Sequence, residues 1–356
     1  MNRARWLAPL LLILARPAVA QEPTAPAEVK RAFLALIDRP KVPLDPMFGG
    51  VGGRGFLSEQ GSFATERRAD GTVERVPALI LSQKDPGPRP KKRPAVILLH
   101  GTGGNKNGMA PWLSELAQRG FVAIAIDGRY HGDRAGGSKG ADAYNAAIVR
   151  AWRSNPGEPQ EHPFYYDTCW DVMRTIDYLQ IRPDVDPDRI GLLGISKGGI
   201  ETWLTGAVDD RVKVAIPAIS VQSFRWGLDH DRYHGRAATI GAASRAAAED
   251  LGHDKVDAEV CRALWDKLIP GITDRFDGPS MLHLFAGRPL LILNGETDPN
   301  CPIEGAELAF DAARKAYAAA GDEEKLKILV AKGSGHTVTD EQHRAAVEWL
   351  VRWLKP

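Results

Sequence analysis

Ser196 combines a reactive group with an unusual setting, in the stretch Gly194-Ile195-Ser196-Lys197-Gly198-Gly199. An apolar run at 189–195 precedes it, and a run with helical spacing at 197–208 follows it. A G-x-S-x-G pattern between a strand and a helix is typical of a nucleophilic serine on a strained turn, where glycines let neighbouring backbone approach closely. The alternative is a serine that only caps the helix. The context favours a nucleophile.

A second group, His100-Gly101-Thr102-Gly103-Gly104, follows the apolar run 95–99. Its small residues allow backbone N–H groups to approach a substrate, as in HGGG-type loops that stabilise the oxyanion of a tetrahedral intermediate. We predict an oxyanion hole formed by the N–H groups of Thr102 and of Lys197, the residue after the nucleophile. Each such donor is worth about 3 kcal/mol in the transition state. Gly103 is predicted to contact substrate. A purely structural glycine turn is the alternative.

An acid and a base follow later in the chain. Asp298 lies just past the apolar run 290–293, and His336 lies just past the run 326–330. A serine hydroxyl is a weak nucleophile until a histidine accepts its proton, and a carboxylate fixes the tautomer of that histidine. We therefore predict the catalytic triad Ser196, Asp298 and His336. Glu296, two residues before Asp298, is a rival acid.

These groups need a parallel sheet, because the carboxyl ends of parallel strands meet at one edge. Apolar runs alternate with helical patterns, which indicates an α/β fold whose mostly parallel sheet carries helices on both faces. An Asp70-Gly71 hairpin, between strands at 55–67 and 73–82, is expected to add antiparallel edge strands. The segment 41–55 is rich in Gly and Pro and is predicted to be loop. The other expected strands are 95–99, 121–126, 189–195, 212–216, 289–294 and 326–330; the expected helices are 28–38, 111–119, 167–180, 197–208, 304–320 and 340–354.

A stretch at about 218–287 interrupts the alternation and is mainly helical, so we predict a cap insertion. Trp226 in this stretch and Tyr130 after an earlier strand are predicted to contact substrate. The cap aromatics either stack on substrate or form the core of the cap, and its arginines either bind an anionic substrate or face solvent. The residues concerned are Phe224, Trp226, Tyr233 and Trp265, and Arg225, Arg232 and Arg236.

The N-terminus predicts export. Positive residues, a short apolar run and Ala18-Val19-Ala20 form the pattern of a signal peptide at 1–20, and the apolar run is too short to span a bilayer. We expect a leader at 21–54 and a hydrolase domain at 55–356, with no membrane span once the signal is removed and a secreted or periplasmic location.

Composition excludes some classes of function. The formal net charge is +1, with 44 % apolar and 26 % charged residues, so nucleic acid and anionic membrane are not expected partners. The three cysteines, Cys169, Cys261 and Cys301, allow one disulfide and a free thiol in an oxidising compartment. They show no metal-binding spacing, so we expect no metal and no cofactor. The sequence gives no indication of oligomeric state.

On these motifs, from about residue 73 to 354, the chain resembles the α/β-hydrolase superfamily. The motifs at the strand ends are most similar to the branch of dienelactone hydrolases, acetyl xylan esterases and prolyl-oligopeptidase-like enzymes. Dienelactone hydrolases proper use a cysteine where this chain has Ser196. The stretch Arg129-Tyr130-His131-Gly132-Asp133 departs from the Asp-x-Arg-Gly-x-Gly loop of relatives and is interpreted as pocket wall. Other stretches, beginning at Tyr166, Asp186 and Val221, resemble a poorly characterised group of plant and bacterial hydrolases.

The resemblance implies a serine esterase that forms an acyl-enzyme on a small-molecule or carbohydrate ester. Three alternatives stay open: a prolyl-oligopeptidase-like peptidase, an acyl thioesterase, and a non-catalytic binding protein on a hydrolase scaffold. The turn at 194–199 that carries Ser196, here called the elbow, also resembles that of acyl-CoA thioesterases. Export disfavours CoA substrates.

Overall fold

The computed structural model describes residues 25–53, 55–84 and 90–356, so the predicted signal peptide at 1–20 lies outside the described residues. Its described strands form one sheet of nine, in the order β1-β2-β3-β5-β4-β6-β7-β8-β9. The first three strands and the β3–β5 pair are antiparallel, and every later pair is parallel. The strands are β1 (Met47–Gly52), β2 (Phe56–Arg67), β3 (Val73–Gln83), β4 (Arg93–Leu99), β5 (Val122–Ile126), β6 (Val185–Ile195), β7 (Val212–Ala218), β8 (Leu290–Gly295) and β9 (Leu326–Ala331).

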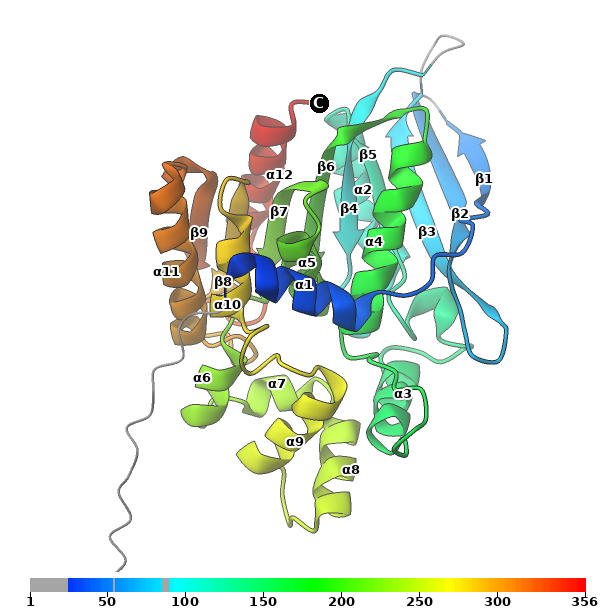
Figure 1. The fold of residues 1–356 in the computed structure, drawn as a ribbon. Helices are drawn as coiled ribbons and strands as arrows, with labels where there is room; N and C mark the ends of the chain where they lie inside the picture. Colours follow the sequence, from blue (N-terminus) through cyan, green and yellow to red (C-terminus); the bar gives the residue numbers. More distant parts are fainter. Residues whose placement is uncertain (1–24, 54, 85–89) are drawn as a thin grey trace, which may run out of the picture.

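Helices cover both faces of the sheet (Figure 1). The α-helices are α1 (Pro26–Ile37), α2 (Ala110–Gln118), α3 (Asp142–Trp152), α4 (Tyr166–Ile181), α5 (Lys197–Val208), α6 (Phe224–Asp229), α7 (His234–Ala238), α8 (Gly241–Leu251), α9 (Ala258–Leu268), α10 (Gly278–Leu282), α11 (Ile303–Ala320) and α12 (Asp340–Leu354). The α/β fold predicted from the alternating pattern is confirmed.

Strand β4 shows why the central strands are apolar throughout. Ala95, Ile97 and Leu99 pack into the core under α1, α4, α5 and α11, whereas Val96 and Leu98 pack under α2 and α12. Successive side chains of a strand point to opposite faces, and here helices cover both. The strand is therefore buried along its whole length, which fixes the position of the loop that follows Leu99.

The N-terminal part of the chain departs from the prediction in one element. The segment expected to be loop at 41–55 contains β1, an exposed edge strand paired with β2. Its sequence, MFGGVG, lacks the alternation of a half-buried strand, because every residue except Phe48 is exposed. The Phe48 ring stacks on Tyr178 of α4, with ring centres 5.1 Å apart. Before it, α1 places Phe33 in the main core, so the chain is packed against the sheet from α1 onward.

The segment 218–287 leaves the sheet at the end of β7 and forms helices α6 to α10. Helices α6 to α9 lie at the edge where the parallel strands end (Figure 1). Within this segment, the rings of Phe224 and Trp265 meet edge to face at 5.3 Å, and both side chains are buried, as is Tyr233. These three aromatics form the core of the insertion. In the described part of the chain, no helix has the length and hydropathy needed to cross a bilayer.

Candidate active site

Ser196 lies at the turn between β6 and α5 in a conformation that side chains rarely adopt. Its φ is 55° and its ψ is −114°, in the left-handed half of backbone space. Such strain persists only where the surroundings hold it, and here the Ser196 N–H donates to the Ala218 carbonyl at 2.9 Å. The side chain is 9 % exposed. The structure thus presents the hydroxyl at the edge of a rigid turn.

The glycines around Ser196 are required by close approach of backbone. A Cβ on Gly194 would lie 2.1 Å from the Gly198 carbonyl oxygen, and a Cβ on Gly198 would lie 2.4 Å from that of Leu99. A Cβ on Gly199 would lie 2.3 Å from the Ser220 Oγ. The first turn of α5 therefore packs directly on the ends of β4 and β7, and any larger residue would displace Ser196.

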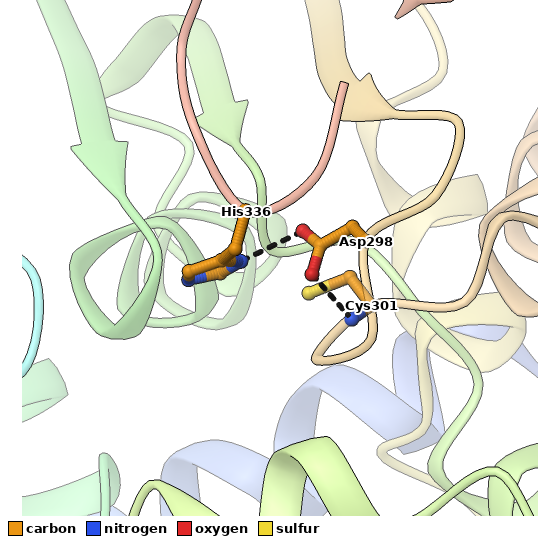
Figure 2. Close-up of side chains that lie close together, drawn as sticks. All are labelled: Asp298, Cys301 and His336. Atoms are coloured by element: carbon orange, nitrogen blue, oxygen red, sulfur yellow. Dashed lines mark hydrogen bonds and ion pairs between the residues drawn. The ribbon is translucent and has the colours of Figure 1, made fainter. Parts of the chain in front are cut away.

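His336 and Asp298 complete a chain of hydrogen bonds with Ser196. His336 Nε2 is 2.7 Å from the Ser196 Oγ. His336 Nδ1 is 2.7 Å from the Asp298 Oδ2, the contact drawn in Figure 2. Because the carboxylate accepts from Nδ1–H, Nε2 is left free to accept the serine proton. The Asp298 side chain is buried, and the His336 side chain is 24 % exposed. The structure brings the three predicted triad residues together in the predicted order.

The loop after β8 holds Asp298 in place. Its Oδ1 accepts from the backbone N–H groups of Asn300 at 2.8 Å and Cys301 at 3.3 Å. A Cβ on Gly295 would lie 2.2 Å from the Gly335 carbonyl oxygen, so the loop carrying His336 passes directly over the end of β8. The rival acid Glu296 is exposed and accepts from the Gly333 N–H at 2.7 Å instead. It has no contact with the His336 ring.

The predicted oxyanion loop lies against the nucleophile. A Cβ on Gly101 would lie 3.5 Å from the Ser196 Cβ. The Gly101 carbonyl accepts from the Gly104 N–H at 3.0 Å and is 2.8 Å from the His100 Nδ1. Since a trans peptide sets C=O and the next N–H in opposite directions, the Thr102 N–H points away from this turn. The Lys197 N–H, at the first position of α5, has no acceptor within its own helix.

His100 holds that loop through a fixed tautomer. The Gly128 N–H donates to the His100 Nε2 at 3.0 Å, so the ring proton must be on Nδ1, which donates to the Gly101 carbonyl. Burial and the nearby Lys197 cation lower the pKa of His100 to about 4. The ring stays neutral near pH 7 and can serve as acceptor and donor at once. Sequence reasoning placed His100 in the motif but gave it no role.

Behind the elbow, the Lys197 side chain is buried and pairs with Glu201, one helical turn along α5. The Lys197 Nζ also lies 5.6 Å from the centre of the Tyr144 ring. Burial raises the pKa of Glu201 to about 7, although Lys197 opposes the shift. The sequence signal available for this pair was a lysine and a glutamate four residues apart on one predicted helix.

The predicted substrate contacts fall in different places. Gly103 has a φ of +77°, and a Cβ there would lie 3.6 Å from the Ala141 backbone N just before α3. The Tyr130 hydroxyl donates to Glu161 at 2.6 Å. Trp226 stacks on His230 with ring centres 4.5 Å apart. Among the described residues, neither Tyr130 nor Trp226 has a hydrogen bond or ring contact with the triad, so their roles stay predictions.

The three arginines of the predicted cap differ in burial. Arg236 is buried and donates to the Asn300 carbonyl at 3.1 Å and to the Cys301 Sγ at 2.9 Å, which ties α7 to the loop of Asp298. Arg225 and Arg232 are exposed. Sequence reasoning did not foresee a buried guanidinium here. Cys169, Cys261 and Cys301 are all free and buried, so the structure contains no disulfide between them.

Within the described residues, one group of side chains has the composition of a metal site: Asp298, Cys301 and His336, whose ligand atoms lie within 4.8 Å of one another (Figure 2). Each of these atoms already has a protein partner. His336 bonds to Asp298 and Ser196, and the Cys301 Sγ lies 3.3 Å from the Ile219 carbonyl oxygen and accepts from Arg236. These atoms are therefore engaged in hydrogen bonds within the protein.

Two family models match parts of the chain. Residues 74–224 match the family "Acetyl xylan esterase (AXE1)", and residues 160–321 match the family "Glucuronyl esterase, fungi". The chain is 27 % identical over 296 residues to the putative hydrolase YtaP of Bacillus subtilis, covering 79 % of this chain and 84 % of that one. It is 32 % identical over 202 residues to the uncharacterized peptidase YuxL of the same organism, covering 56 % of this chain but only 25 % of that one.

A solved structure with a similar fold is the acetyl xylan esterase from Paenibacillus sp. R4. The two chains superpose with a TM-score of 0.62 at 20 % identity, over 91 % of this chain and 92 % of the other. At that identity the likeness establishes the fold. The two family models that match parts of the chain both describe esterases.

Proposed function

We propose that the protein hydrolyses carboxylic esters of carbohydrates through an acyl-enzyme on Ser196. The observation that carries the proposal is the hydrogen-bond chain from the Ser196 Oγ through His336 to Asp298, with both contacts at 2.7 Å. Both family matches, to acetyl xylan and glucuronyl esterases, favour an ester of a carbohydrate as the substrate. An acetylated sugar is the simplest member of that class.

In the first half-reaction, the Ser196 Oγ attacks the ester carbonyl carbon while His336 Nε2 takes the serine proton. The carbonyl oxygen becomes an oxyanion, which the N–H groups of Thr102 and Lys197 stabilise. The C–O bond to the alcohol then breaks, and His336 returns the proton to the leaving oxygen. Asp298 stabilises the imidazolium throughout. The products are the free sugar hydroxyl and an acyl group on Ser196.

In the second half-reaction, water replaces the alcohol. His336 takes one proton from the water as its oxygen attacks the acyl carbon, and the oxyanion forms in the same place. Collapse of the intermediate breaks the bond to Ser196, which regains the proton from His336. One carboxylic acid leaves for each ester consumed, and the chemistry needs no group beyond these side chains and water.

The test is hydrolysis of a panel of esters by the parent and by Ser196→Ala: acetylated sugars, feruloyl esters, short and long acyl esters, and a thioester. We expect cleavage of acetylated sugars by the parent and a loss in kcat of about 10⁶-fold in the variant, as for other serine triads. Full activity in Ser196→Ala would contradict the mechanism. A preference of the parent for the thioester would favour a thioesterase over an ester hydrolase.

The match to a peptidase favours one other activity for the same triad, cleavage of an amide. An amide places a poorer leaving group on the same intermediate, so the same residues serve either bond. A proline-containing p-nitroanilide decides between them. Faster turnover of this amide than of any ester in the panel would favour the peptidase.

We also propose that the chain is exported. The signal pattern at 1–20 supports this, and N-terminal sequencing of the protein from its producing cell tests it. A mature chain beginning at Gln21 is the expected result, and a chain that retains its first residues in the cytoplasm would contradict export.

A further inference from the structure

An open cavity of about 480 Å³, facing solvent and lined partly by exposed residues, lies between α3 on one side and α7 and α8 on the other. Its volume is in the range of small-molecule sites. Apolar walls come from small residues that leave room: Ala146, Val149, Ala238 and Ala242. The polar lining is provided by Asp142, Asn145, Thr239 and Arg245. None of these residues has a place in the catalytic geometry described above.

Both walls of this cavity are attached to loops of the candidate active site. Asp142 directly follows Ala141, whose backbone N would lie 3.6 Å from a Cβ on Gly103 of the oxyanion loop. On the other wall, Ala238 ends α7, and a Cβ on Gly235 at the start of α7 would lie 2.1 Å from the Pro299 carbonyl oxygen, next to Asp298. Each wall of the cavity is therefore continuous with a helix end that packs against a loop of the candidate active site.

Several polar groups in the cavity have unused bonding capacity. The Asn145 Oδ1 is buried and lacks a hydrogen-bond partner, while its Nδ2 donates to the Ala141 carbonyl at 3.0 Å. Among the described residues, the side chains of Asp142 and Arg245 have no ion pair or hydrogen bond. The Thr239 hydroxyl donates to the Arg236 carbonyl at 2.7 Å and keeps its acceptor capacity. A buried acceptor without a donor costs stability unless a ligand or water supplies one.

The chemistry of these groups favours a neutral polyhydroxylated ligand. One carboxylate, one amide oxygen, one guanidinium and one hydroxyl offer both acceptors and donors, as sugar hydroxyls require. The charges of Asp142 and Arg245 are opposite, so the cavity has no excess positive charge to select an anionic substrate. The alanine and valine side chains can cover the C–H face of a sugar ring.

We propose that this cavity is a glycosyl subsite, which binds a sugar unit of the ester substrate while the ester itself lies at Ser196. The proposal rests on the proposed function and assigns the part of the molecule that recognises the alcohol portion. Helix α3 and the insertion helices α7 and α8 form the subsite, whereas the strand-end loops hold the reacting carbonyl. A small ester such as p-nitrophenyl acetate has no sugar unit and does not reach it.

The experiment compares an acetylated xylo-oligosaccharide with p-nitrophenyl acetate in three variants. Ala242→Trp fills the cavity from an exposed position of α8, and Asn145→Ala removes the unpaired acceptor. Glu249→Trp is the matched control, an exposed position two turns further along α8. We expect kcat/KM for the oligosaccharide to fall about tenfold or more with Ala242→Trp and about fivefold with Asn145→Ala, the usual effect of one hydrogen bond. It stays at the parent value with Glu249→Trp.

All three variants are expected to cleave p-nitrophenyl acetate like the parent. Equal kinetics of Ala242→Trp and the parent on the oligosaccharide would overturn the subsite, and so would a parent that cleaves p-nitrophenyl acetate but no acetylated oligosaccharide. Full activity of Ser196→Ala on p-nitrophenyl acetate would instead overturn the proposed function. The two failures are therefore distinguishable.

Discussion

The loops at the strand ends and the helical insertion at 218–287 lie at the same edge of the sheet, yet they are built differently (Figure 1). The strand-end loops are glycine-rich, and their backbones approach within distances that exclude a Cβ, as at Gly194 and Gly198. The insertion is held by buried aromatics such as Phe224 and Trp265. Backbone contacts thus fix the positions of the predicted triad residues, whereas packing of side chains holds the insertion together.

This difference predicts where substitutions should affect chemistry and where they should affect stability or recognition. In the strand-end loops, close backbone contacts leave no room for a larger residue, so substitutions there should displace the predicted triad. In the insertion, exposed positions can change without disturbing the triad. Four substitutions test the two sides of this contrast.

Asp298→Asn is expected to lower kcat by about 10⁴-fold, because an amide in place of the carboxylate favours the wrong tautomer of His336. Steady-state kinetics on p-nitrophenyl acetate measures the loss. Glu296→Gln, two residues away and bonded to the Gly333 N–H, is the matched control and should stay within about threefold of the parent. If Glu296→Gln were the damaging change, the assignment of the acid would be reversed.

Lys197→Met tests the buried pair behind the elbow. It leaves the Glu201 carboxylate buried without its cation, so we expect a loss of about 3–5 kcal/mol in the free energy of unfolding at pH 8. Lys197 lowers the pKa of Glu201, so without this lysine burial raises that pKa further above its ordinary value of 4.5. The loss should therefore shrink as the pH falls from 8 towards 4.5, because the unfolded chain then protonates Glu201 as well. Urea unfolding at several pH values measures it.

The double variant Lys197→Met/Glu201→Gln is the control for that loss. With no buried charge left, it should recover most of the stability at pH 8. A single variant as stable as the parent at pH 8 would show that the ion pair does not carry the packing of the first turn of α5.

His131→Phe tests the buried histidines near the oxyanion loop. Burial and the Lys197 cation lower the pKa of His131 to about 2, so the folded chain keeps the ring neutral while the unfolded chain protonates it below its ordinary value of 6.5. This lowered pKa costs stability as the pH falls below 6.5, by about 2 kcal/mol at pH 5. The stability difference between pH 7 and pH 5 should be smaller by that amount in the variant. An unchanged difference would mean that His131 is protonated in the fold.

Trp226→Ala should give the smallest effect. The ring is partly exposed and stacks on His230, away from any contact with the triad. We expect kcat/KM for p-nitrophenyl acetate within about twofold of the parent and a stability loss of about 1 kcal/mol. A large loss in kcat would instead support the prediction that Trp226 contacts substrate.

The sequence was most informative for features that only a few residue types can form. A serine at a strand-to-helix turn needs glycines at fixed spacing, and the order of Ser196, Asp298 and His336 along the chain follows from the order of the strands. Apolar runs buried on both faces likewise made the parallel sheet predictable. Strand β1 was missed because its exposed glycine-rich sequence has no periodic burial to detect.

Long-range partners were not predictable. The tautomer of His100 is set by Gly128 from the next strand, and the burial of Arg236 depends on its contact with the loop of Asp298. Neither partner is near in sequence, and nothing in the local pattern distinguishes a buried arginine from a solvated one. The Lys197–Glu201 pair had a local signal, the spacing of four, but burial of that helix face came only with α3 and α4 packed against it.

The most direct test of the central claim is covalent labelling of the folded enzyme with a fluorophosphonate, followed by peptide mass spectrometry. We expect one label on the peptide that contains Ser196, complete loss of ester hydrolysis with it, and no label in Ser196→Ala or after denaturation. A parent that hydrolyses esters while Ser196 stays unlabelled, or a label on another residue that accounts for the lost activity, would contradict the account.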